Sequence, residues 1–279
     1  MAEITTALIN DLRTRTNAGM MDCKKALIET KGDMDAAIKL LRERGQAIQV
    51  KRASKEANQG IVKSAVSADG RTMALVEVNC ETDFVAKTDN FKKFVDAVAA
   101  KALAGDENVA VTMKDDHSAI VAATGENVKI RRTSRFVLTG TGRLESYIHM
   151  GGKVGVLIEV ASGKADSVAQ PAFVEVIHDL ALQVAAASPR WLLSTEIPAD
   201  IIETEKDIYR KQVEGKPANV VEKILEGKLK KFYSETCLVD QPFVKEPKMS
   251  VTQLLNDAAK KVGDTLVIKR FVRYQLGAA

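Results

Sequence analysis

Cysteine is scarce in this sequence. The 279 residues include three cysteines, Cys23, Cys80 and Cys237, which lie far apart in the chain. Their odd number and the absence of any CxxC spacing argue against a disulfide framework and against a zinc site. This use of cysteine suits a reducing compartment, and we therefore expect a cytoplasmic protein.

Long apolar runs are also missing. No stretch is long and apolar enough to span a bilayer, and the N-terminal segment lacks the basic start and apolar block of a signal peptide. We therefore expect neither a membrane segment nor a secretory leader. With 46% hydrophobic and 28% charged residues, the composition is that of a globular protein with two or three compact units.

A strong net charge and the usual catalytic motifs are absent too. The formal charge of +4 is too small to indicate a nucleic-acid partner by itself. There is no GxxxxGK[ST] loop and no GxSxG elbow, and the three histidines do not show metal-binding spacing. Asp83 beside Phe84 would suit a general base of raised pKa, but no nucleophile is near it in the sequence. The sequence therefore gives little support to an enzyme and predicts neither a cofactor nor a metal.

The first 50 residues show the pattern of three short helices. Apolar residues recur at helical spacing from Ile4 to Leu12, and Asp22 and Asp33 are suited to cap the second and third helices. Three helices in so few residues have little core, since a typical helix has about 11 residues. A module of this kind usually binds a partner. The polar and basic segment 49–60 predicts a linker after it.

An internal repeat follows this segment. Residues 60–78 match residues 142–160 without a gap, at an offset of 82 positions, and several glycine, serine and glutamate positions are identical. Each copy has the pattern of a hairpin followed by a helix that starts at Phe91 or Phe173. The hairpins turn at glycine-containing dipeptides, Asp69-Gly70 and Gly151-Gly152.

A third strand is expected to complete each copy of the repeat. Residues 127–140 are suited to this role in the first copy and residues 265–277 in the second, because two strands alone are marginally stable. Between them, residues 198–235 predict two charged helices that meet at Gly215-Lys216-Pro217. This helical hairpin either pairs with a second copy of the chain or lies in solvent. The predicted fold class is α+β.

One segment of the repeat differs in character between the two copies. Residues 79–85, NCETDFV, align with ASGKADS at 161–167, so the fold alone does not require the acidic and aromatic pair Asp83 and Phe84. We predict a polar loop that presents Phe84, although a ring tucked beneath its own helix is the plainer alternative. Glu77 and Glu159 fall at equivalent positions of the repeat and suggest a solvated strand face.

Four basic clusters admit two interpretations. They lie at 51–55, 129–135, 228–231 and 269–273, and two of them are on predicted strands. Alternating basic residues on a strand are usually the wet face of a half-buried sheet. The functional alternative is nucleic-acid binding through phosphates, but few aromatic residues are interleaved with these clusters. Met20 and Met21 are equally open to interpretation, as core residues of a small bundle or as an adaptable contact surface.

Several blocks of the sequence resemble one known family. The blocks are LRTRTNAGMMDCKKAL (12–27), EVNCETDFVAK (77–87), SYIHMGGKVGVL (146–157), GKP (215–217) and QPFVKEP (241–247). They cover nearly the whole chain and resemble the elongation factor Ts family. Members of that family are the guanine-nucleotide exchange factors of elongation factor Tu in bacterial translation.

The resemblance implies an α+β fold with four parts. They are a ubiquitin-associated-like helical domain (1–54), a first core subdomain (55–140), a second core subdomain (141–197 and 236–279) and an inserted coiled-coil-like hairpin (198–235). It also implies binding to elongation factor Tu, both GDP-bound and nucleotide-free, and replacement of GDP by GTP. The family does not act as an enzyme, so no catalytic residue is expected. Neither a membrane nor direct nucleic-acid contact is expected, and a homodimer through 198–235 stays open.

The resemblance further implies a set of partner-binding residues. The segment Thr82, Asp83, Phe84 and Val85 would push into the GTPase domain of the partner and disturb its Mg²⁺ site. His149 would contact another domain of the partner, and the helical module would contribute Met20, Met21 and Lys24.

Two departures from the family pattern are visible. Asn17 stands where glycine is expected, and asparagine tolerates the left-handed backbone of such a turn. The chain ends in YQLGAA, so contacts from a further C-terminal helix are not expected.

Overall fold

The N-terminal segment forms the three predicted helices. The computed structural model describes residues 4–16, 18–213 and 217–278, so the position of Asn17 lies outside the described residues. The helices are α1 (Thr6–Thr16), α2 (Met20–Glu29) and α3 (Met34–Arg52). They enclose a small core around Leu12, Cys23 and Leu27. The cores of most globular domains are larger, so these helices contribute modestly to stability.

The two predicted helix caps in this segment have different outcomes. The carboxylate of Asp33 accepts the backbone N–H of Ala36 at 2.9 Å, which confirms Asp33 as the N-cap of α3. The prediction that Asp22 caps the second helix is wrong, because α2 begins at Met20 with Gly19 as its N-cap. Asp22 lies in the first turn instead, where a negative charge favours the helix dipole.

Helix α3 is longer than predicted and runs into the segment expected to be a linker. It continues to Arg52 because its last turns pack against α7 (Lys114–Thr124). Gly45 makes this packing close, since a Cβ at this position would lie 2.3 Å from the carbonyl oxygen of Ser118. Arg42 also forms an ion pair with Asp115 at 3.4 Å. Such contacts between distant segments are not visible in local sequence.

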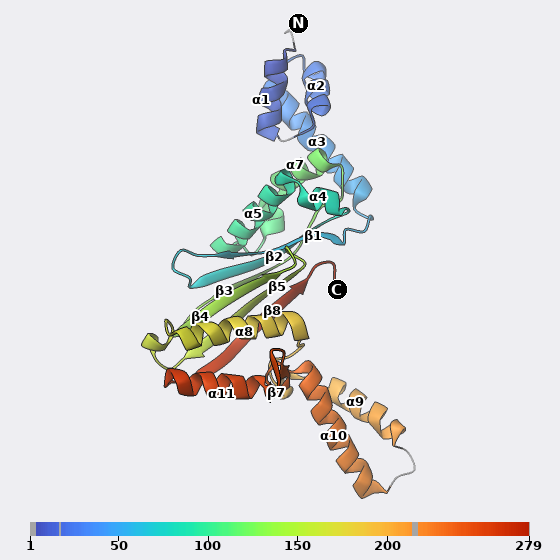
Figure 1. The fold of residues 1–279 in the computed structure, drawn as a ribbon. Helices are drawn as coiled ribbons and strands as arrows, with labels where there is room; N and C mark the ends of the chain where they lie inside the picture. Colours follow the sequence, from blue (N-terminus) through green and yellow to red (C-terminus); the bar gives the residue numbers. More distant parts are fainter. Residues whose placement is uncertain (1–3, 17, 214–216, 279) are drawn as a thin grey trace. The chain divides into compact units, whose positions relative to one another are not determined.

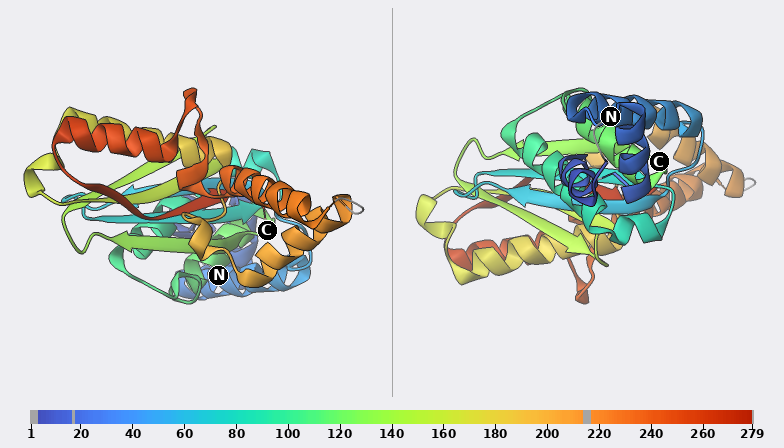
Figure 2. Two further views of the ribbon diagram at one scale, coloured as in Figure 1. Left: turned by 90° about the horizontal axis from the view of Figure 1, so that it is seen from below. Right: turned by 90° about the horizontal axis from the view of Figure 1, so that it is seen from above.

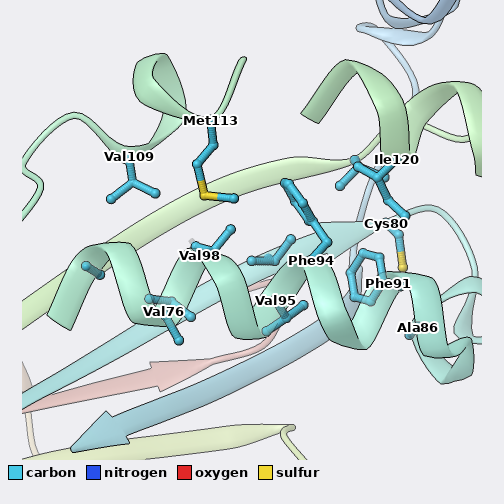
Figure 3. Close-up of a cluster of buried hydrophobic side chains, with 14 of the residues drawn as sticks. Val76, Cys80, Ala86, Phe91, Phe94, Val95, Val98, Val109, Met113 and Ile120 are labelled. Atoms are coloured by element: carbon cyan, nitrogen blue, oxygen red, sulfur yellow. The ribbon is translucent and has the colours of Figure 1, made fainter. Parts of the chain in front are cut away.

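The first repeat forms a three-stranded sheet in the order β1-β2-β3. Its strands are β1 (Gln59–Val66), β2 (Thr72–Cys80) and β3 (Lys129–Val137). β1 and β2 are antiparallel, with Gln59 opposite Cys80, and Gly70 has the positive φ that their turn needs. Helix α5 (Asp89–Ala104) covers one face of the sheet (Figure 1). Figure 3 shows the core between them, with Phe91 beside Cys80 and Ala86.

The second repeat forms a three-stranded sheet in the order β4-β5-β8. Its strands are β4 (Gly142–His149), β5 (Val154–Ser162) and β8 (Leu266–Gln275). Helices α8 (Pro171–Ala187) and α11 (Val251–Val262) pack against each other beside this sheet (Figures 1 and 2). The two sheets with their helices confirm the predicted α+β fold and both predicted third strands.

Several elements were not predicted. The first repeat adds α6 (Val109–Thr112) and α7, and the second adds α11, β6 (Pro242–Phe243) and β7 (Glu246–Ser250). Short 3₁₀ turns are present at Ala165–Ser167, Ser194–Glu196 and Leu238–Asp240. Helix α11 has a capping box, in which Ser250 accepts the N–H of Gln253 and Gln253 accepts the N–H of Ser250. That pattern was a sequence signal for the helix.

Two long helices form the predicted hairpin. They are α9 (Ala199–Gln212) and α10 (Ala218–Thr236), and they lie side by side (Figures 1 and 2). Of the predicted turn, Gly215 and Lys216 lie outside the described residues, and Pro217 is the N-cap of α10. A small cluster around Phe232 and Cys237 anchors the base of the hairpin.

The expectation of a solvated strand face at Glu77 and Glu159 is wrong. Their side chains are 0% and 9% exposed. Each carboxylate instead pairs at 2.7 Å with an arginine of the third strand of its own sheet, Arg132 for Glu77 and Arg270 for Glu159. The same guanidinium groups stack on aromatic rings, with Arg132 over Tyr274 and Arg270 over Phe136. Two residues of the basic clusters are therefore internal partners of buried acids.

The chain divides into two compact units. One contains Met1–Arg135, Ile148–Gly155 and Tyr274–Ala279, and the other contains Phe136–Tyr147 and Val156–Arg273. The first unit holds α2, the segment after β2 and the turn after β4, which are the places where the predicted site residues lie.

Candidate partner-binding site

The segment after β2 is a short helix and not the loop that was predicted. Helix α4 (Asp83–Lys87) begins at once after Thr82, whose backbone is extended. The hydroxyl of Thr82 accepts the N–H of Val85 at 3.3 Å and so caps the helix. Threonine followed by an acid in the first turn was a local signal for this start. A five-residue helix is too short to stand alone, so its surroundings must hold it in place.

Helix α4 divides sharply into a buried and an exposed side. Ala86 is buried in the core of the first repeat (Figure 3). Val85 is partly buried and packs against the same core. Phe84 is 78% exposed, so the alternative that its ring tucks beneath its own helix is wrong. Leaving a phenylalanine ring in water forgoes about 2 kcal/mol of burial. A polar residue at this position would avoid that cost, so the stability of the fold does not explain the phenylalanine.

The charged neighbours of Phe84 belong to the same helix. Lys87 forms an ion pair with Asp83 at 2.6 Å, and its ammonium lies 5.9 Å from the centre of the Phe84 ring. The hydrogen bond from Lys87 lowers the pKa of the Asp83 carboxyl below its usual range. The hypothesis of a general base with a raised pKa at Asp83 is therefore wrong. Asp83 carries its charge at neutral pH and presents an anion beside the exposed ring.

The segment before α4 is tied to two other parts of the first unit. Both carboxylate oxygens of Glu81 accept hydrogen bonds from the same guanidinium nitrogen of Arg52 on α3, at 2.9 and 2.7 Å. The carboxylate also accepts the backbone N–H of Asn127 at 2.6 Å. Glu126 accepts further hydrogen bonds from Glu81 and Thr82. Sequence reasoning missed these residues, because their partners are far away in the chain.

His149 lies at the end of β4 and is exposed. Its carbonyl oxygen accepts the N–H groups of Gly152 and Lys153, which close the turn between β4 and β5. Met150 follows with a positive φ of 49° and is 73% exposed. The predicted contact residue therefore stands beside a second exposed apolar side chain.

The remaining predicted residues lie at the start of α2. Met20 and Met21 are 47% and 62% exposed, so they are surface residues and not the core of the three-helix segment. Lys24 is exposed as well, and Ile28, one turn beyond it, is 54% exposed. Met21, Lys24 and Ile28 share one face of the helix by their spacing. The structure thus leaves two exposed apolar side chains on this face, with the exposed Lys24 and Lys25 on either side of them.

No group of three or more His, Cys, Asp or Glu side chains in residues 4–16, 18–213 and 217–278 is arranged to hold a metal ion. Over the same residues, no helix is both long enough and apolar enough to cross a membrane. The three cysteines are free and buried.

Comparison with known proteins identifies the family. The family model described as elongation factor TS matches residues 81–278, which include α4 and every strand of the two sheets except β1 and β2. The chain belongs to the elongation factor Ts family. The resemblance drawn from the sequence blocks is thereby confirmed, and the protein is an elongation factor of protein synthesis.

Relatives match over almost the full chain. Elongation factor Ts of Trichlorobacter lovleyi is 44% identical, with 98% of this chain and 93% of the relative covered. Elongation factor Ts of Nitratidesulfovibrio vulgaris is 41% identical, with 98% and 96% covered. The protein of the same name from Nitratiruptor is 43% identical, with 98% and 93% covered. The similarity therefore extends to the three N-terminal helices, which the family model does not include.

Proposed function

We propose that this member of the elongation factor Ts family is the guanine-nucleotide exchange factor of elongation factor Tu. One observation carries the proposal: α4 holds Phe84 78% exposed beside a charged Asp83. A large ring held in water on an ordered helix is suited to fill a pocket of a protein partner, and such anchors dominate interface energies. Family membership supplies the identity of the partner.

The proposed mechanism acts on the Mg²⁺ site of the partner. Thr82–Val85 enters the GTPase domain of elongation factor Tu, where the Phe84 ring separates side chains and Asp83 takes up donors. Mg²⁺ requires nearly ideal octahedral geometry, so a small displacement of its ligands weakens the bound nucleotide steeply. GDP then leaves, and GTP replaces it from solution.

This mechanism requires no catalytic residue and no cofactor in the factor itself. The protein binds GDP-bound elongation factor Tu and stabilises its nucleotide-free form. Coupling between two ligands is reciprocal, so the factor by which this protein weakens nucleotide binding equals the factor by which nucleotide weakens its own binding. GTP entering the empty site therefore promotes release of the exchange factor. We propose an exchange factor that acts by binding, and not an enzyme.

The other exposed residues extend the proposed interface. His149 contacts a second domain of the partner, and Met20, Met21 and Lys24 contact the GTPase domain. Their exposure and the adaptable shape of methionine side chains support these roles. The four-part division into 1–54, 55–140, 141–197 with 236–279, and 198–235 belongs to the same proposal, as does a cytoplasmic location. Pairing of two copies through 198–235 stays a prediction.

The competing function is nucleic-acid binding through the basic clusters. Arg132 and Arg270 are less suited to it than the sequence indicated, because buried glutamates and aromatic rings engage both guanidinium groups. No structural observation favours phosphate binding by the basic clusters in the way that the exposed ring of Phe84 favours a protein partner.

Stopped-flow release of a fluorescent GDP from elongation factor Tu tests the proposal. The chain should accelerate release, and the concentration that gives half of the maximal rate should rise by less than about tenfold between 50 and 200 mM salt. Phosphate binding by six or more basic side chains would weaken by about a thousandfold over this range. Absence of acceleration at any salt concentration would remove the exchange function.

A further inference from the structure

The carboxylate of Glu126 holds the start of α4 from outside that helix. Glu126 lies between α7 and β3, and its Oε2 accepts the backbone N–H groups of Glu81 and Thr82, each at 3.1 Å. Its Oε1 accepts the hydroxyl hydrogen of Thr82 at 2.6 Å. One side chain therefore satisfies three donors just before Asp83. Charged acceptors make such bonds stronger than neutral ones.

These contacts orient the cap of α4. Because Thr82 donates its hydroxyl hydrogen to Glu126, a lone pair of the same oxygen is left to accept the N–H of Val85. Hydrogen bonds run in both directions between residues 81–82 and residues 126–127. Asn127 donates its N–H to the carboxylate of Glu81, while Glu81 and Thr82 donate their N–H groups to the carboxylate of Glu126. Asn127 is 2% exposed and donates its amide to the carbonyl of Lys55. The anchor of α4 is thus itself fixed.

The second repeat has an equivalent hydrogen bond from a carboxylate to the turn after its middle strand, but it has no phenylalanine in that turn. Lys164 is the repeat equivalent of Thr82, and its N–H donates to Oδ2 of Asp264 at 2.8 Å. Asp264 precedes β8 as Glu126 precedes β3, and its Oδ1 accepts the N–H of Thr265 at 2.7 Å. In each unit a carboxylate before the third strand fixes the turn after the middle strand. Only the first repeat uses that turn to present a phenylalanine.

We propose that Glu126 is a positioning residue of the exchange reaction, which acts through α4 by fixing the direction of Phe84. The inference rests on the proposed function of Phe84. This role does not require contact between Glu126 and the partner. Without its carboxylate, the N–H groups of Glu81 and Thr82 lose their acceptor, and a five-residue helix has too few internal bonds to keep its orientation.

Amide hydrogen exchange of the free chain tests the contact without the partner. In Glu126→Ala, the amides of Glu81 and Thr82 should exchange at least about tenfold faster, while the amide of Lys164 keeps its rate. Asp264→Ala is the matched control and should show the opposite pattern. Unchanged protection of Glu81 and Thr82 in Glu126→Ala would overturn the proposal.

A double-mutant cycle tests the consequence for exchange. Glu126→Ala should lower the maximal rate of GDP release by about tenfold, because misplacing a functional group by about 1 Å has effects of this size or larger. In the Phe84→Ala background it should cause no further loss. Glu126→Gln keeps one acceptor oxygen and should recover most of the rate, and Asp264→Ala should exchange at the full rate.

The outcomes separate this proposal from the proposed function. If Glu126→Ala lowers the maximal rate of GDP release equally with and without Phe84, its role is a general structural one and the positioning role is overturned. The same holds if Asp264→Ala lowers the rate as much as Glu126→Ala does. A loss in Phe84→Ala with none in Glu126→Ala would overturn only this inference. Full activity of Phe84→Ala would overturn both. Thermal unfolding of each variant shows whether the chain is folded. If Glu126→Ala does not fold, Glu126→Asp replaces it in the cycle with the same expected loss, because its shorter side chain withdraws the carboxylate from the N–H groups of Glu81 and Thr82.

Discussion

At the scale of single residues, two buried glutamates organise the two sheets. Glu77 receives the guanidinium of Arg132, the N–H of Gly277 and the amide of Asn79. Glu159 receives Arg270 at the equivalent place of the second repeat. An ionised carboxylate without partners in such a position would cost several kcal/mol, so each arginine is needed where it stands.

Removing one partner of this pair gives a stability prediction. Arg132→Ala should lower the free energy of unfolding by about 3 kcal/mol, because it leaves the charge of Glu77 buried and incompletely paired. Lys129→Ala, at an exposed position of the same strand, should change it by less than about 0.5 kcal/mol. Urea unfolding followed by circular dichroism measures both. Equal effects of the two substitutions would contradict a structural role of the pair.

The sequence pattern of these residues explains why they were misread. Glu77 sits in a strand of mainly apolar residues, and Arg132 lies 55 positions away in a basic cluster. Periodicity reports only which residues share a face, and not which face is covered or what crosses it. Phe84 presents the same difficulty, since its exposure depends on how Val85 and Ala86 pack into the core. Resemblance to a family supplied the proposed site residues, whereas local pattern left open whether they lie in the core or on the surface.

At the scale of elements, the structure separates what is local from what is not. Hairpin turns at glycines, the strands beside them and the helices that contain Phe91 and Phe173 follow from short patterns and were predicted, although each helix starts two residues before its phenylalanine, at Asp89 and Pro171. The last turns of α3 depend on α7, and α4 depends on Glu126 and Glu81. Neither dependence appears within a window of neighbouring residues, so the first was assigned to a linker and the second to a loop.

The packing of α3 on α7 can be tested with glycine substitutions. Gly45→Ala should destabilise the protein by about 1–3 kcal/mol, because the added methyl group would meet the carbonyl of Ser118. Gly227→Ala, within α10 and with open space around it, should stabilise by up to about 1 kcal/mol through helix propensity. Thermal unfolding of both variants decides. Equal stabilisation by the two would show that α3 does not depend on this contact.

At the scale of the whole molecule, one scaffold occurs twice and carries different turns. Both repeats have the order of hairpin, helix and third strand, and both fix the turn after the middle strand with a carboxylate. After the middle strand, the first repeat continues into α4 with its exposed ring, and the second continues into a short 3₁₀ turn at Ala165–Ser167. Duplication therefore separates the residues that build the fold from those that the proposed function needs.

In the proposed mechanism, Phe84 drives nucleotide release without contributing to the stability of the fold. The most direct measurement compares GDP release from elongation factor Tu with the unaltered chain, with Phe84→Ala and with Val111→Ala, whose exposed apolar side chain lies on α6. Phe84→Ala should slow release at least about 30-fold, which corresponds to a hot-spot contribution of about 2 kcal/mol. Its free energy of unfolding should change by less than about 0.5 kcal/mol, and Val111→Ala should keep the full rate. Release at the full rate by a folded Phe84→Ala protein would show that Phe84 does not drive nucleotide release.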